Sequence, residues 1–217
     1  RLIACLHCTV AVGRTMLGSP ERYPEGRMHV LPLLNYSLPG VDPNDIKKCL
    51  ITFQLVSTLV SLVPLVDCSG AVFSRSDLTE EERELCSATA QFEDFVLQFL
   101  DRVFVLIDNS AHTHTRTDSM QTDKLTHEEM MLEVGLLSTF SVIVQQSSTP
   151  IFQELLKRLF RFVSTSFMEI HVAGKFTADL IRSMVKARPE TALKTFINHF
   201  CDTVKARTSS EDLSKEE

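Results

Sequence analysis

Apolar residues at helical spacing recur along most of the chain, and this repetition constrains the fold more than any other feature. The pattern runs over 3–12, 46–63, 85–107, 130–144, 151–162, 173–185 and 193–204. Residues three or four positions apart share one face of a helix, so each segment predicts an amphipathic helix. Each apolar face is too wide for a helix to stand alone, and the helices must therefore cover one another.

The last four predicted helices begin about twenty residues apart, near Thr126, Pro150, Glu169 and Pro189. Helix pairs therefore recur at about forty residues, the period of HEAT-like repeats. We predict an all-α fold, an α-solenoid of antiparallel helix pairs, over residues 1–208. Two loops at 13–42 and 109–125 interrupt it, and residues 209–217 are predicted to be an acidic linker or a disordered tail.

Capping signals suggest where the helices begin. We expect caps at Asp42 with Pro43 in the first turn, at Thr79 in a capping box with Glu82, at Thr126 in a box with Glu129, and at Thr149 before Pro150. Pro64 should end the second helix, and Arg188-Pro189 should separate the last two.

The inward faces follow from the same spacing. We expect these residues to be buried: Met130, Val134, Leu137 and Val144, with Leu136, Phe140 and Ile143 beside them; Ile151, Leu155, Leu159 and Phe162, with Phe152, Leu156 and Phe160; Ala173, Phe176, Leu180, Met184 and Val185; and Leu193, Phe196, Ile197, Phe200 and Val204. Polar stripes should face outward at Glu154, Lys157, Arg158 and Arg161, and at His171, Lys175, Asp179, Arg182 and Lys186.

Composition excludes several classes of protein. With 44% hydrophobic and 23% charged residues, the chain is neither wholly disordered nor fibrous. Seven Gly leave few places for a phosphate-binding loop, and no P-loop, G-x-S-x-G, H-E-x-x-H or dinucleotide fingerprint occurs. We therefore predict a protein that is not an enzyme, with no catalytic, cofactor-binding or metal-binding residues in this segment.

Charge is distributed unevenly. Residues 42–149 carry seven basic and seventeen acidic groups, whereas residues 150–208 carry ten basic and five acidic groups. A basic stretch can attract polyanions, but solvated helix faces usually explain such runs. Most of the fourteen Phe fall on the predicted helices and Trp is absent, which leaves few aromatic rings for stacking on bases. We expect no direct nucleic-acid partner.

One uncharged stretch, Cys49 to Val66, raises the question of membrane insertion. A membrane span needs about 20 predominantly apolar residues. Thr52, Gln54 and Ser57 interrupt this stretch, and Pro64 breaks its last turn. We interpret it as a helix buried in protein and expect no membrane association.

Cysteines and histidines offer candidate ligands. Cys5 and Cys8 form a C-x-x-C around His7, which is half of a zinc site or a redox pair, but no second half follows in the sequence. At helical spacing we favour core positions for both thiols, on a face shared with Ile3 and Val12. His112 and His114 fall in the second loop, and we interpret them as loop residues. His171 and His199 lie on or beside polar faces, and we interpret them as solvated or capping rather than catalytic.

The loop at 13–42 holds both Tyr of the chain and three arginines, Arg14, Arg22 and Arg27. Guanidinium groups match the geometry of phosphate, so these arginines are candidates for an anion or partner site. A packed crossing between helices with solvated arginines is the alternative, and it is the one we favour.

The same loop carries a resemblance. LIACLHCTVAVGRTMLGSPERYPEGRMHVLPLLNYSLPGVDPND, followed by DLTEEERELCSATAQFEDFVLQFLDR, resembles the family of large HEAT-repeat proteasome activators. The match is close over 2–45 and 77–102 and looser to about Arg207, with departures at 69–76 and 111–124. The chain opens without Met inside a helical pattern, so we interpret it as a fragment of a longer protein.

The resemblance implies a nuclear and cytoplasmic protein that docks on the core proteasome and promotes degradation without ATP or ubiquitin. It also implies degradation of acetylated histones and roles in DNA repair and spermatogenesis. Inositol phosphates are expected as ligands of the family, but we can match none of the arginines here to that role. The alternative is a general HEAT-repeat scaffold or adaptor unrelated to the proteasome.

Overall fold

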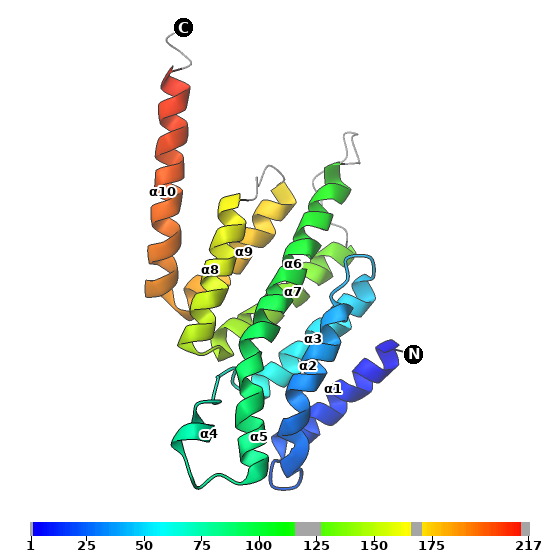
Figure 1. Cartoon of the computed structure of the whole chain (residues 1–217). Coiled ribbons are helices and arrows are strands. Elements are labelled where there is room, and N and C mark those ends of the chain that lie inside the picture. The colour runs from blue at the N-terminus through cyan, green and yellow to red at the C-terminus, as the bar shows by residue number, and fades with distance from the viewer. Residues whose placement is uncertain (1, 116–126, 166–170, 214–217) are drawn as a thin grey trace.

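The computed structural model describes residues 2–115, 127–165 and 171–213, which are largely helical (Figure 1). The elements are α1 (Leu2–Gly18), η1 (Pro24–His29), α2 (Val30–Ser37), η2 (Leu38–Gly40), α3 (Ile46–Leu62), α4 (Ala71–Ser74), α5 (Glu80–Ala88), η3 (Thr89–Gln91), α6 (Phe92–Thr115), α7 (His127–Gln146), α8 (Thr149–Thr165), α9 (His171–Ala187) and α10 (Pro189–Leu213). These residues form no strand, and one isolated parallel bridge joins Leu65 to Ser147.

The long helices lie in two layers, and within each layer they pack side by side (Figure 1). Helices α1, α3, α7 and α9 pack side by side in that order, and α2, α6, α8 and α10 form the other layer. Between the layers, α3 contacts α2, and α9 contacts α6, α8 and α10. This stacking confirms the predicted α-solenoid, because successive helices pack against one another in rows and bury a core between the two layers.

The core lies between the two layers and is continuous from α2 to α10. Six of its phenylalanines are 2% exposed or less, namely Phe53, Phe95, Phe99, Phe140, Phe152 and Phe196. The rings of Phe53 and Phe99 meet edge to face with centroids 6.1 Å apart, so α3 and α6 interlock across the layers. Burying a large apolar side chain stabilises the fold by roughly 1.5–3 kcal/mol, so these rings dominate the packing.

Helices α3 and α7 approach closely because α7 carries small residues where they meet. A Cβ added at Gly135 would lie 3.2 Å from Cδ2 of Leu50, closer than ordinary contact. One turn on, the buried Thr139 hydroxyl lies 3.1 Å from the backbone carbonyl of Phe53 and 2.9 Å from that of Gly135. Even an alanine at Gly135 would require the Leu50 side chain to move by a few tenths of an ångström.

Hydrogen bonds also connect the turns at one end of the stack. Leu65, which follows α3, donates its N–H to the carbonyl of Gln146 over 3.0 Å and accepts the N–H of Ser148 over 2.9 Å. Arg188, between α9 and α10, reaches the Ser147 carbonyl with Nη2 at 2.6 Å, and its guanidinium lies 4.7 Å from the ring centroid of Phe152. Three successive inter-helix connections are thereby joined, which fixes neighbouring pairs relative to one another.

The predicted loop boundaries need correction. The segment 13–42 is not a loop: α1 continues to Gly18, and η1, α2 and η2 follow. Proline caused the wrong prediction, although Pro24 and Pro39 sit in the first turns of 3-10 helices, where a missing N–H costs nothing. The second loop also begins later than predicted, because α6 runs to Thr115, and residues 116–126 lie outside the described part.

Likewise, the tail predicted from residue 209 is helical as far as Leu213, and 214–217 lie outside the described residues. Of the predicted caps, the Thr79–Glu82 capping box is confirmed. The cap of α3 is Asp45, whose carboxylate accepts the N–H of Lys48, and not Asp42. Helix α8 begins at Thr149 itself, and the proposed box at Thr126 lies outside the described part.

The long apolar pattern from Leu85 to Ile107 is two helices and not one, because the 3-10 turn η3 separates α5 from α6. At this break the Thr89 hydroxyl accepts the N–H of Cys68 over 2.7 Å, which anchors the start of the α4 segment to the turn. A continuous period therefore concealed a change of helix type, since the apolar spacing of 3-10 and α turns is nearly the same over three residues.

The inward faces are confirmed best for α8, where five of the seven expected residues are buried and Phe160 and Phe162 are half-buried. On α9, Phe176, Leu180 and Met184 are buried as expected. Asp179 of the predicted outward stripe is also buried and forms an ion pair with Arg182.

Three predicted faces are partly wrong. Leu193, Ile197, Phe200 and Val204 of α10 are 38–61% exposed, and Ala192 and Phe196 are the only fully buried residues among those of this helix whose side chains the structure describes. On α7, Met130 and Val134 are exposed. On α1, Ile3, Val12, Cys5 and Cys8 are exposed. These residues have the right spacing, but no described element packs on their side of the helix.

Candidate functional site

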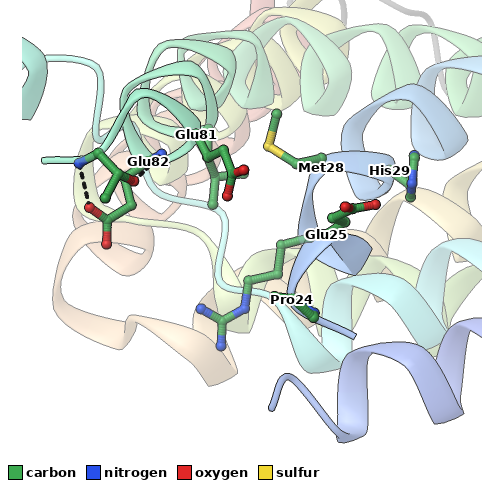
Figure 2. Close-up of a pocket in the computed structure, with 9 residues that line it drawn as sticks. Pro24, Glu25, Met28, His29, Glu81 and Glu82 are labelled. Atoms are coloured by element: carbon green, nitrogen blue, oxygen red, sulfur yellow. Dashed lines mark hydrogen bonds between the residues drawn. The ribbon is translucent and has the colours of Figure 1, made fainter. Parts of the chain in front are cut away.

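A groove of about 470 Å³ lies between η1 and the first turns of α5 (Figure 2). From η1 it is lined by Pro24, Glu25, Arg27, Met28 and His29, and from the α5 side by Thr79, Glu81, Glu82 and Leu85. Its volume falls within the range of roughly 300–1,000 Å³ typical of ligand sites. Glu25 of η1 and Glu81 of α5 therefore line the groove from its two walls, and Figure 2 shows the Glu25 carboxylate on the side of His29 and the Glu81 side chain beside α5.

Close packing on α1 positions the η1 wall. Gly26 is buried there, and a Cβ at this position would lie only 2.6 Å from Cγ of Met16 on α1. The absence of a side chain at Gly26 therefore lets η1 rest directly on α1. Its neighbours Glu25 and Arg27 consequently point away from α1 and are exposed.

The capping box positions the α5 wall. The Thr79 hydroxyl accepts the N–H of Glu82 over 3.2 Å, and the Glu82 carboxylate accepts the N–H of Thr79 over 2.9 Å. These bonds satisfy the free N–H groups at the start of the helix and hold the Glu82 side chain against the backbone. Glu81, one residue earlier, takes no part in the box and is exposed.

The three candidate arginines of segment 13–42 do not converge. Arg27 lines the η1–α5 groove. Arg14 lines a different groove of about 300 Å³ between α1, α3 and α7, together with Gln54, Ser57 and Ser138. Arg22 is exposed in the turn before η1 and lines neither groove. The arginines therefore do not form one phosphate cradle.

The cysteine pair lies on an exposed face. Cys5, His7 and Cys8 are all exposed on α1. In the described ranges, no three His, Cys, Asp or Glu side chains are arranged to hold a metal ion. Cys49 is the buried thiol: it donates to the Asp42 carbonyl and accepts the Asp42 N–H, both at 3.0 Å. Burial raises the pKa of Cys49, so this thiol is unreactive near neutral pH.

Of the histidines, His199 is half-buried on α10, with its ring 5.1 Å from that of Phe160 in an edge-on contact. His199 is therefore packed against a ring of α8, which differs from the solvated or capping role expected from the sequence. The side chains of His112, His114 and His171 lie outside the described part of the structure.

No helix within the described ranges has both the length and the apolar character needed to cross a bilayer. The uncharged stretch at Cys49–Val66 forms α3 and the turn after it, and most of α3 is buried between its neighbours. The interpretation of this stretch as a helix buried in protein is confirmed.

Sequence reasoning missed that Glu25 and Glu81, which lie 56 positions apart in the chain, line one groove. The capping box was visible in the sequence, so the α5 wall of the groove could be placed. The 3-10 turn that forms the other wall carries no apolar period that would have revealed it.

Comparisons with known proteins agree with the fold. A family model described as proteasome activator complex subunit 4, mid HEAT repeats region, matches residues 1–78 and 69–212. The chain is 50% identical over all 217 residues to proteasome activator complex subunit 4B of Danio rerio and 49% identical to proteasome activator complex subunit 4 of Homo sapiens. It spans 12% of the length of each of these relatives. The chain therefore belongs to the proteasome activator complex subunit 4 family and corresponds to part of its middle HEAT-repeat region.

Proposed function

We propose that this chain is a non-catalytic structural segment of a proteasome activator that caps the core proteasome. The observation that carries the proposal is the family match over nearly the whole chain, together with the names of relatives about 50% identical to it. Because the chain spans only 12% of those relatives, activation of the proteasome is a property of the whole protein, to which this segment contributes.

The physical contribution of the segment is to hold shape. Helix α3 packs between α1 and α7, and α7 packs between α3 and α9. Hydrogen bonds at Leu65, Ser147 and Arg188 connect neighbouring helix pairs. A stack of this kind transmits load along its row and keeps a fixed curvature, because each repeat contacts only its neighbours. A shell around the end of a protease needs to keep its shape, and it needs no reactive groups of its own to do so.

The finer parts of the proposal concern the whole protein. Degradation would proceed without ATP or ubiquitin and would include acetylated histones, which a segment outside this chain would bind. Roles in DNA repair and spermatogenesis, and a nuclear and cytoplasmic location, belong to the same proposal. Inositol phosphates are proposed as ligands of the whole protein, with no residue of this chain assigned to them.

The test uses the full-length polypeptide and purified core proteasome. We expect native-gel co-migration and faster hydrolysis of a fluorogenic peptide in the absence of ATP. Degradation of acetylated histones should exceed that of unmodified histones under the same conditions. Absence of any binding to the core proteasome would favour the alternative, a general HEAT-repeat adaptor.

A matched pair of variants tests the role of this segment. Phe140→Asp places a charge at a fully buried site of α7, whereas Tyr36→Asp changes a side chain on α2 that is 84% exposed. We expect only the first variant to lose activation, since a buried unpaired charge disrupts the stack. Equal activation by both variants and the wild type would show that the segment is dispensable.

A further inference from the structure

The groove between η1 and α5 has features of a binding surface that the proposed shell function does not use. It is open to solvent, and its two walls come from elements held firmly by other contacts, Gly26 against α1 and the capping box at Thr79. Its shape is therefore set in advance, which lowers the entropy cost of binding.

The lining combines apolar and acidic groups. Pro24, Met28 and Leu85 supply apolar surface, and Met28 and Leu85 are half-buried with part of each side chain accessible. Glu25 and Glu81 supply carboxylates to the lining, one from each wall. Within the described ranges neither carboxylate forms an ion pair, and the third carboxylate, Glu82, is engaged by the capping box.

The charge around the groove is also negative. Glu80 and Glu84 extend the acidic run of α5. They belong to residues 42–149, which contain seventeen acidic and seven basic residues. Arg27 is the one arginine in the lining. It forms no ion pair with Glu25 or Glu81 in the described structure, so its N–H groups can donate to the carbonyls of a bound backbone.

We propose that this groove binds an extended, lysine-bearing peptide segment of a separate partner protein. The lysine ammonium sits between Glu25 and Glu81, and its aliphatic stem lies along Met28 and Leu85, the arrangement that long cationic side chains favour. Arg27 donates to a carbonyl of the same peptide. The proposal rests on the shape and charge of the groove and is independent of the proteasome function.

Fluorescence anisotropy with the full-length polypeptide tests this proposal. The probe is a fluorescein-labelled dodecapeptide with lysine at every third position among serine and leucine, and the comparison peptide carries glutamate at those positions. We expect the lysine peptide alone to bind, with an affinity that falls as salt rises. The double variant Glu25→Gln/Glu81→Gln should weaken binding roughly tenfold, since it removes two charge-assisted contacts.

Glu190→Gln/Asp202→Asn is the matched control, because it also removes two exposed carboxylates, both on α10 and neither in the groove lining. We expect its affinity to stay within about twofold of the wild type. A photoreactive version of the lysine peptide should crosslink to residues 24–29 or 79–85. The proposal is overturned if both peptides bind equally, if neither binds, if the double variant binds as well as the control, or if the crosslinks map elsewhere.

Discussion

Helices α8 and α10 lie side by side in the same layer, and both have apolar residues at regular helical spacing. They differ in how deeply those residues are buried. Ile151, Phe152, Leu155, Leu156 and Leu159 of α8 are each 5% exposed or less. Among the side chains of α10 that the structure describes, only Ala192 and Phe196 reach that level, while four residues at equally regular spacing are 38–61% exposed. Helix α8 has α6 on one flank and α10 on the other, whereas no described helix covers the outer flank of α10. In a solenoid, burial therefore depends on position in the row as well as on the pattern.

Phe152→Ala should give the largest effect, because its ring is fully buried in the core. Removing a buried Phe costs about 3 to 5 kcal/mol through lost transfer energy and the cavity left behind. Urea unfolding of residues 1–217, followed by circular dichroism, measures this cost. A loss below about 1 kcal/mol would mean that α8 is no better packed than α10.

Arg188→Ala should have the next largest effect, since this side chain links the turn before α10 to the turn before α8. Its loss removes a hydrogen bond to the Ser147 carbonyl and the contact with the Phe152 ring, which we expect to cost about 1 to 3 kcal/mol. Arg188→Lys keeps the charge but not the planar group, and it should recover only part of the loss. Full recovery by lysine would show that charge alone acts here.

Asp101→Asn tests the contact between α6 and α8 at the surface. Arg158 donates two hydrogen bonds to the Asp101 carboxylate, from Nε to Oδ1 at 2.8 Å and from Nη2 to Oδ2 at 2.6 Å. These bonds raise the pKa of Arg158. Both side chains are about two-fifths exposed, so solvent screens the pair and we expect a loss of at most about 1 kcal/mol. Double-mutant cycles with Arg158→Ala would measure the coupling, and a value near that of a buried pair would contradict this estimate.

Phe200→Ser should have the smallest effect on stability. Its ring is 42% exposed on the open flank of α10. We expect a change within about 0.5 kcal/mol, comparable to that of Lys186→Ala, which alters an exposed lysine of α9. Self-association of residues 1–217, measured by light scattering, should decrease because the variant breaks an apolar stripe. A destabilisation similar to that of Phe152→Ala would mean that the open flank is covered.

The contrast between α8 and α10 also shows what could be predicted from the sequence. Helix periodicity and the Thr79–Glu82 capping box depend on neighbours in the chain, so the layered fold and that helix start were predicted correctly. Coverage of Ile197 depends on a different helix, and no local pattern reports it. The groove lined by Glu25 and Glu81 also depends on a contact between segments far apart in the chain. One of its walls is a 3-10 helix whose proline and glycine led to the prediction of a loop.

The backbone bridge at Leu65 has a consequence for how this fold tolerates change over time. Its two hydrogen bonds use only main-chain atoms of Leu65, Gln146 and Ser148, so replacing their side chains leaves the donors and acceptors in place. Among the standard residues, only proline at position 65 or 148 would delete a donor. Relatives that differ at half of all positions can thus inherit the same junction without conserving any particular side chain there.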